Sequence, residues 1–152
     1  MSAAQIIYLV CGILLIQAVV WAFIFRWIRG KSAEVKGDME KVLGSAEGKI
    51  LIGPESAVYR GADKRFGNIR GNGVICLTAN KIIFKKLVGR DIEIDRSDIA
   101  GATVEDWFKG KTSFATGAKH LVIKTQDGNR IGFLIKDAPK WARAVLSANH
   151  AG

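Results

Sequence analysis

The first 25 residues of this 152-residue chain contain no lysine, arginine, aspartate or glutamate. All 23 basic and 14 acidic residues follow Phe25, and the formal net charge is +9. Cysteine, histidine and proline are scarce, with two of each. Two cysteines are too few for a disulfide framework, and two separated histidines do not indicate a metal site. The sequence therefore predicts no metal and no cofactor, and its 17 glycines favour a domain rich in turns and strands.

A long apolar run fills the uncharged N-terminal region. From Ile6 to Phe25 the chain reads IIYLVCGILLIQAVVWAFIF, in which Gln17 is the only strongly polar residue. A helix of this length rises about 30 Å, the thickness of the hydrocarbon core of a bilayer. A cleaved signal peptide would need a basic start and a shorter apolar core. A buried core helix is the other alternative. We predict a retained transmembrane helix within an anchor of residues 1–29.

Basic residues follow the apolar run, and none precedes it. They are Arg26, Arg29, Lys31 and Lys36. Because positive charge is retained on the cytoplasmic side, the sequence predicts a single-pass protein with its N-terminus outside and its C-terminal domain in the cytoplasm. The membrane, with an anionic inner leaflet, is then the first expected partner.

Residues 30–49 are expected to form a helical linker, because their apolar positions follow helical spacing. These positions are Val35, Met39, Val42, Leu43 and Ala46. Three alternatives stay open for this helix: it continues the anchor, it packs on the following domain as a spacer, or it lies on the membrane surface.

From Ile50 the apolar pattern changes to a period of two, which is typical of strands. Seven strands are predicted, at Ala57–Arg60, Gly73–Thr78, Lys81–Leu87, Asp91–Ile94, Gly101–Glu105, His120–Thr125 and Arg130–Ile135. A C-terminal helix capped by Asp137 and carrying Trp141 on its apolar face follows them. The fold class is therefore α+β, mainly β, with about seven antiparallel strands and a closing helix in a domain of residues 50–148. Residues 149–152 form a tail.

Two stretches resemble the GRAM and bacterial pleckstrin-homology-like (PH-like) domains. The stretch 73–84, GVICLTANKIIF, is similar to the glycine, apolar, threonine, apolar, phenylalanine signature of these families. The stretch 92–99, IEIDRSDI, is similar to the element that follows it. The resemblance covers about residues 50–148. It implies a two-sheet barrel closed by the C-terminal helix, and family members bind lipid headgroups, peptides or proteins.

No catalytic motif is recognisable in the chain. There is no Ser/His/Asp or Cys/His arrangement and no phosphate-binding glycine loop followed by lysine. His120 and His150 are expected to be solvated. Acidic residues alternate along the 91–95 segment, which is typical of the solvent face of a strand. The sequence therefore predicts a protein that is not an enzyme.

Basic residues concentrate between residues 50 and 90, where eight basic and two acidic residues occur. Six of them are candidate lipid- or anion-binding residues: Lys64, Arg65, Arg70, Lys81, Lys85 and Lys86. The first three fall in the loop between the first two strands, the position in which lipid-binding PH domains place basic residues. A solvated basic surface that faces the anionic leaflet is the alternative interpretation.

A second candidate surface combines aromatic and basic residues in a predicted loop. Its residues are Trp107, Phe108, Lys109, Lys111 and Phe114. Exposed aromatic side chains with basic neighbours suit contact with a partner protein or a membrane. The alternative is that Trp107 packs in the core.

These observations lead to two hypotheses for function. The first is a membrane-anchored, non-catalytic PH/GRAM-like interaction module that docks a protein partner or serves as an accessory subunit of a membrane complex. The second is a reader of anionic lipid headgroups on the inner leaflet. Nucleic-acid binding is less favoured, because a nearby leaflet already accounts for a basic surface. Association of identical chains stays open.

Overall fold

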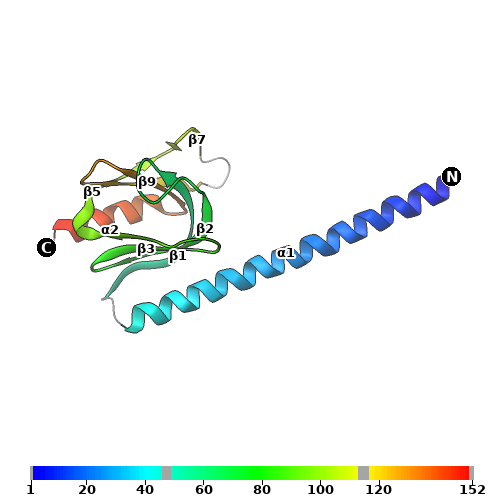
Figure 1. Ribbon diagram of the computed structural model, residues 1–152, viewed down its shortest axis with the longest axis horizontal. Coiled ribbons are helices and arrows are strands. Elements are labelled where there is room, and N and C mark those ends of the chain that lie inside the picture. Colours follow the sequence, from blue (N-terminus) through cyan, green and yellow to red (C-terminus); the bar gives the residue numbers. More distant parts are fainter. Residues whose placement is uncertain (1, 46–48, 113–116, 151–152) are drawn as a thin grey trace. The chain divides into compact units, whose positions relative to one another are not determined.

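The computed structural model describes residues 2–45, 49–112 and 117–150 of the chain (Figure 1). The chain forms two compact units, Met1–Glu34 and Val35–Gly152. The fold is α+β and mainly β, as the sequence predicts: an apolar N-terminal helix precedes a seven-stranded antiparallel sheet and a C-terminal helix.

The first helix, α1 (Ala3–Ser45), has 43 residues and includes both the predicted anchor and most of the predicted linker. Its part Ala4–Met39 is long and apolar enough to cross a membrane. Gly37 does not interrupt the helix, so the linker continues the anchor rather than forming a separate helix. Some predicted linker positions lie outside the described side chains, namely Val42, Leu43 and Ala46.

All seven predicted strands are present, and the first begins earlier than expected. They are β1 (Ile50–Ala62), β2 (Gly71–Thr78), β3 (Lys81–Lys86), β4 (Ile92–Asp95), β5 (Ile99–Glu105), β8 (Lys119–Thr125) and β9 (Arg130–Ile135). They pair in the order β4-β3-β2-β1-β9-β8-β5. A further short hairpin, β6 (Trp107–Phe108) with β7 (Lys111–Thr112), forms where the sequence predicted a loop.

One face of the sheet forms the main core, because apolar residues alternate along its strands. The second helix, α2 (Ala138–His150), packs against this core beside β5 and β8 (Figure 1). Asp137 caps α2 by accepting a hydrogen bond from the backbone N–H of Lys140 at 3.2 Å. Trp141 is fully buried, and its Nε1 donates to Glu55 Oε2 at 3.1 Å. This indole fixes the start of α2 against β1.

A smaller apolar cluster lies on the opposite face of β2 and β3. Val74, Cys76 and Ile83 are buried there under Met39, with Val35 packed at the edge. The last turns of α1 therefore pack on the sheet and belong to the second compact unit.

The two outermost strands of the sheet, β4 and β5, are joined only by a 3-10 turn, η1 (Arg96–Asp98). The backbone N–H of Arg96 donates to the Asn80 carbonyl at 2.8 Å. On the other side, the N–H of Gln126 donates to the Asp98 carbonyl at 2.8 Å. This turn links the β2–β3 connection to the β8–β9 connection.

Candidate functional site

The loop between β1 and β2 is held in place by contacts with the main core. Phe66 has a positive φ of 72° and packs against the main core. The buried hydroxyl of Tyr59 donates to the Gly67 carbonyl at 2.7 Å. Burial raises the pKa of Tyr59 to about 12, so the hydroxyl keeps the proton that it donates. The loop is thus positioned by the core and presents its polar residues outward.

Two neighbouring loops each end in an exposed apolar residue followed closely by arginine. In the β1–β2 loop, Ile69 is 81% exposed and precedes Arg70. In the β3–β4 loop, Val88 is 75% exposed and precedes Gly89 and Arg90. Lys86 Nζ donates to the Ile69 carbonyl at 3.1 Å and so joins the two loops. We call this surface, made of Ile69, Arg70, Val88 and Arg90, the loop-tip surface.

The six basic residues predicted to bind anions do not form one cluster. Lys81 lies at the opposite end of β3 from the β3–β4 loop, and its ammonium group is 2.8 Å from a carboxylate oxygen of Glu93. The Lys86 ammonium donates a hydrogen bond to the Ile69 carbonyl and lies 4.6 Å from the centre of the Tyr59 ring. These contacts leave both lysines less available to an external anion.

Arg65 faces two carboxylates. Its Nη1 is 4.0 Å from Asp98 and 3.9 Å from Asp127, beside a cavity of about 90 Å³. The hydroxyl of Thr125 donates to Asp127 and is the main reason that the pKa of this carboxyl lies below its ordinary value. Arg65 therefore sits in acidic surroundings, unlike a residue of an anion pocket.

The side chains of Lys64, Arg70 and Lys85 form no hydrogen bond or ion pair in the part of the chain that the structure describes. Of the six predicted basic residues, Arg70 and Lys85 are therefore available to an anionic partner, whereas the charge of Lys64 already acts on the Asp127 carboxylate. Arg90, which the sequence analysis did not select, has the same freedom and lies in the loop-tip surface.

The hairpin β6–β7 buries one of its aromatic rings and exposes the other. Trp107 is 56% exposed, whereas Phe108, also predicted as a contact residue, is 1% exposed. Phe108 lies over Gly132 of β9, where no side chain occupies the space. The alternative that Trp107 packs in the core is therefore wrong, and Phe108 is the core residue instead. The side chain of Lys111 and the whole of Phe114 lie outside the described residues.

Lys109 forms contacts within the protein. Its ammonium donates to the Ala62 carbonyl and, at 2.7 Å, to Asn68 Oδ1, and it lies 3.4 Å from a carboxylate oxygen of Asp63. Lys109 thus braces the β6–β7 hairpin against the β1–β2 loop, a contact for which the sequence contains no local signal.

His120 is fully buried, contrary to the expectation that it is solvated. Its ring centre lies 6.4 Å from that of Phe108, which covers it. Neither ring nitrogen has a hydrogen-bond partner among the described residues. Burial lowers the pKa of His120, and the positive charge of Arg60 lowers it further, while the backbone of Glu105 and Asp106 acts in the opposite direction.

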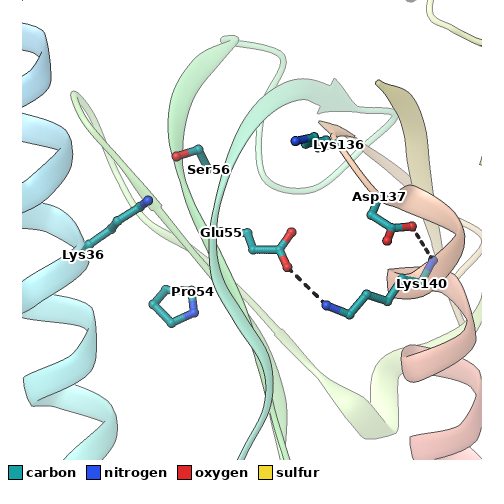
Figure 2. A pocket seen from close by; sticks show the side chains of 7 residues that line it. All are labelled: Lys36, Pro54, Glu55, Ser56, Lys136, Asp137 and Lys140. Carbon is teal, nitrogen blue, oxygen red and sulfur yellow. Dashed lines mark hydrogen bonds and ion pairs between the residues drawn. The ribbon is translucent and has the colours of Figure 1, made fainter. Parts of the chain in front are cut away.

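An open pocket of about 620 Å³ lies between the end of α1, the start of β1 and the start of α2 (Figure 2). It is lined by Lys36, Pro54, Glu55, Ser56, Lys136, Asp137 and Lys140. Lys36 lies far in the sequence from Lys136 and Lys140, so no local motif could have revealed the pocket.

The two cysteines are unpaired. Burial raises the pKa of Cys76 to about 11, which keeps its thiol protonated and unreactive. Among the described residues, no three His, Cys, Asp or Glu side chains are grouped as metal ligands would be. We therefore assign neither cysteine a chemical role.

Neither a comparison with protein-family models nor a comparison with curated proteins gives a match. Function must therefore be argued from the surfaces themselves.

Proposed function

We propose that the chain is a single-pass membrane protein with a cytoplasmic, non-catalytic PH-like domain, and that this domain docks on the anionic leaflet of the same membrane. The apolar part of α1 supports the anchor by its length and composition. Positive charge that follows the apolar run supports a cytoplasmic C-terminal domain. Protease treatment of sealed inside-out and right-side-out vesicles tests the orientation: cleavage of the domain only in the former is expected.

The strand order supports the PH-like assignment. β4 and β5 end the sheet order, yet only the three residues of η1 separate them. A sheet whose two outer strands are joined so closely must curl toward itself, as a barrel does. The stretch 73–84 that carries the resemblance forms the β2–β3 hairpin, and α2 covers the core in the role of a closing helix.

The loop-tip surface is the observation that carries the docking proposal. Two loops that are joined by Lys86 each present an apolar tip and an arginine. Apolar side chains suit the interfacial region of a bilayer, and arginines suit its phosphate groups. The pairing of both kinds of side chain, repeated on adjacent loops, fits an anionic lipid surface better than a solvated face does.

The energies are adequate for a tethered domain. Each basic residue near an anionic leaflet contributes about 1 kcal/mol. Burial of a Val or Ile side chain contributes about 1.5–3 kcal/mol when it is complete. A contact of roughly 4 kcal/mol corresponds to a dissociation constant of about 1 mM. Because a tether gives an effective concentration in the millimolar range, such a contact is populated without a specific lipid pocket.

A spin label at the loop-tip surface tests the proposal. The full-length chain with Cys11→Ser and Val88→Cys is labelled and placed in nanodiscs that contain phosphatidylserine; Cys76 is buried and stays unlabelled. We expect the label to gain accessibility to oxygen dissolved in lipid, and Arg70→Glu with Arg90→Glu to abolish this gain.

Lys124→Glu with Arg143→Glu is the matched control, since both residues are exposed and the change in net charge is identical. This control should leave the label in the lipid. Equal effects of both pairs would mean that only total charge matters, which would contradict docking through the loop tips.

Docking of a protein partner is the second candidate function. The exposed Trp107 favours it, because Phe108 and Lys109 fix the hairpin that carries this ring. A rigidly held, exposed tryptophan is a frequent anchor of protein interfaces. Gentle extraction of the full-length protein, followed by native mass measurement, tests this candidate: loss of a co-purifying chain on Trp107→Ala would support it.

A further inference from the structure

The pocket between α1, β1 and α2 contains more positive than negative charge. Lys36, Lys136 and Lys140 line it, against the carboxylates of Glu55 and Asp137. In Figure 2, Lys36 reaches from α1 toward β1, while Lys136 and Lys140 come from the opposite wall. The three ammonium groups thus border one open volume from two sides.

The two carboxylates already have internal partners. Glu55 Oε2 accepts the hydrogen bond from the Trp141 indole, and Glu55 Oε1 lies 3.7 Å from Lys140 Nζ. Asp137 Oδ1 accepts the backbone N–H of Lys140 as the cap of α2. Their negative charge is therefore directed at the protein's own groups, and Asp137 occupies the end of α2.

Lys36 and Lys136 have no such partner. Neither side chain forms a hydrogen bond or an ion pair with the residues that the structure describes. An anion placed between them would interact with two cations that the fold leaves uncompensated. Lysine binds phosphate as a point charge, without a fixed geometry. Facing lysines of this kind suit a phosphate group.

The size and lining of the pocket restrict the rest of the ligand. A volume of about 620 Å³ falls within the range of small-molecule sites and greatly exceeds that of one phosphate. The lining includes the Ser56 hydroxyl and the two carboxylates, which accept hydrogen bonds from hydroxyl groups. None of the described residues that line the pocket is aromatic, so a nucleobase would lack a stacking surface among them. The lining fits a phosphorylated polyol.

We propose that this pocket binds a phosphorylated polyol, with Lys36 and Lys136 on the phosphate and with Ser56, Glu55 and Asp137 toward the hydroxyl groups. The ligand is either a soluble sugar or inositol phosphate or the headgroup of a membrane lipid. The site is independent of the loop-tip surface and of the docking proposed there, because the two share no residue.

Calorimetric titration of the full-length protein in nanodiscs tests this site. Two probes are compared: soluble inositol 1,4-bisphosphate added to phosphatidylcholine nanodiscs, and phosphatidylinositol 4-phosphate incorporated in the nanodiscs and followed by phosphorus NMR. Lys36→Gln with Lys136→Gln should weaken binding on the order of 10- to 100-fold, because two charge-assisted contacts are lost.

Lys41→Gln with Lys124→Gln is the matched control, because both lysines are exposed and lie outside the pocket. It should leave binding within about twofold, near the variation expected of distant surface changes. Binding of the soluble probe identifies a soluble ligand, and binding of the lipid alone identifies a headgroup. Failure of both probes to bind, or equal weakening by both lysine pairs, would overturn the proposal while leaving the loop-tip measurement unaffected.

Discussion

Gly132 determines which aromatic ring of the β6–β7 hairpin is buried. A Cβ atom built at this position would overlap the ring of Phe108, at a separation that real side chains never adopt. The glycine therefore leaves the space that Phe108 fills, and the neighbouring Trp107 remains outside. A single missing side chain thus sets the orientation of the hairpin.

Gly132→Ala should displace Phe108 and lower the free energy of unfolding by about 1–3 kcal/mol, the usual cost of overpacking. Denaturant unfolding of the full-length protein in detergent measures this change. Gly101→Ala is the control, since its added methyl group meets no atom within 4 Å. An equal effect of the two substitutions would show that Phe108 does not occupy this site.

His120 should make stability depend on pH. Because its folded-state pKa is lowered from 6.5, the unfolded chain takes up a proton before the folded chain does. The contribution of His120 is therefore complete above about pH 6.5 and is lost as the pH falls below that value. The free energy of unfolding should be larger at about pH 7.5 than at about pH 5.5, and His120→Gln should reduce this difference.

His150→Gln provides the comparison for this histidine effect, because it removes the other imidazole of the chain. The pH dependence should persist in that variant. If the pH dependence of stability vanished in His150→Gln and persisted in His120→Gln, burial of His120 would not be its cause.

Residue-scale features were the hardest to predict from the sequence. The choice between Phe108 and Trp107 depends on Gly132, which lies on a different strand and becomes relevant only once the sheet has formed. The sequence contained no local signal for the ring that covers the Gly132 face of the final strand.

At the scale of elements, the β6–β7 hairpin and the β1–β2 loop support each other through Lys109. Lys109→Met should remove these contacts and increase amide hydrogen exchange across residues 63–70, since the loop loses a brace on one side. Lys119→Met is the control: it removes only the surface ion pair with Asp106, which contributes little. Unchanged exchange in Lys109→Met would exclude a bracing role.

The end of α1 is bound to the sheet through Met39. Because this side chain is 1% exposed above Val74, Cys76 and Ile83, Met39→Ala should lower the free energy of unfolding by about 2–5 kcal/mol. Denaturant unfolding measures the loss, and Lys41→Ala, at an exposed position, should change it by less than about 0.5 kcal/mol. Equal losses of unfolding free energy in Met39→Ala and Lys41→Ala would mean that the end of α1 does not pack on the domain.

Long periodic elements were predictable, and short ones were not. Each of the seven strands is an alternating or continuous apolar run of several residues bounded by turn residues, and a run of this length is enough to identify a strand. The β6 and β7 strands have two residues each, too few to show a period. For the linker, the sequence left three alternatives open, and the structure combines two of them: the helix continues the anchor and packs on the domain through Met39.

On the scale of the whole molecule, the candidate surfaces arise from loops and helix ends that folding brings together. Ile69 and Val88 lie on different loops, and their arginines complete the loop-tip surface only when Lys86 joins these loops. The sequence predicted Arg70 as a binding residue on the basis of charge, but it gave no reason to pair it with Arg90. Positions along the chain cannot reveal such a combination, because it depends on strand order.

Docking of the anchored domain on its own membrane is tested most directly by two spin-labelled positions in two membranes. One label is at Val88 in the loop-tip surface, and the other replaces Arg143 on the exposed side of α2. Each is measured in nanodiscs of phosphatidylcholine alone and of phosphatidylcholine with phosphatidylserine. We predict that anionic lipid moves only the Val88 label into the bilayer, and that added salt reverses this. Equal responses at both positions, or none at Val88, would contradict docking through the loop tips.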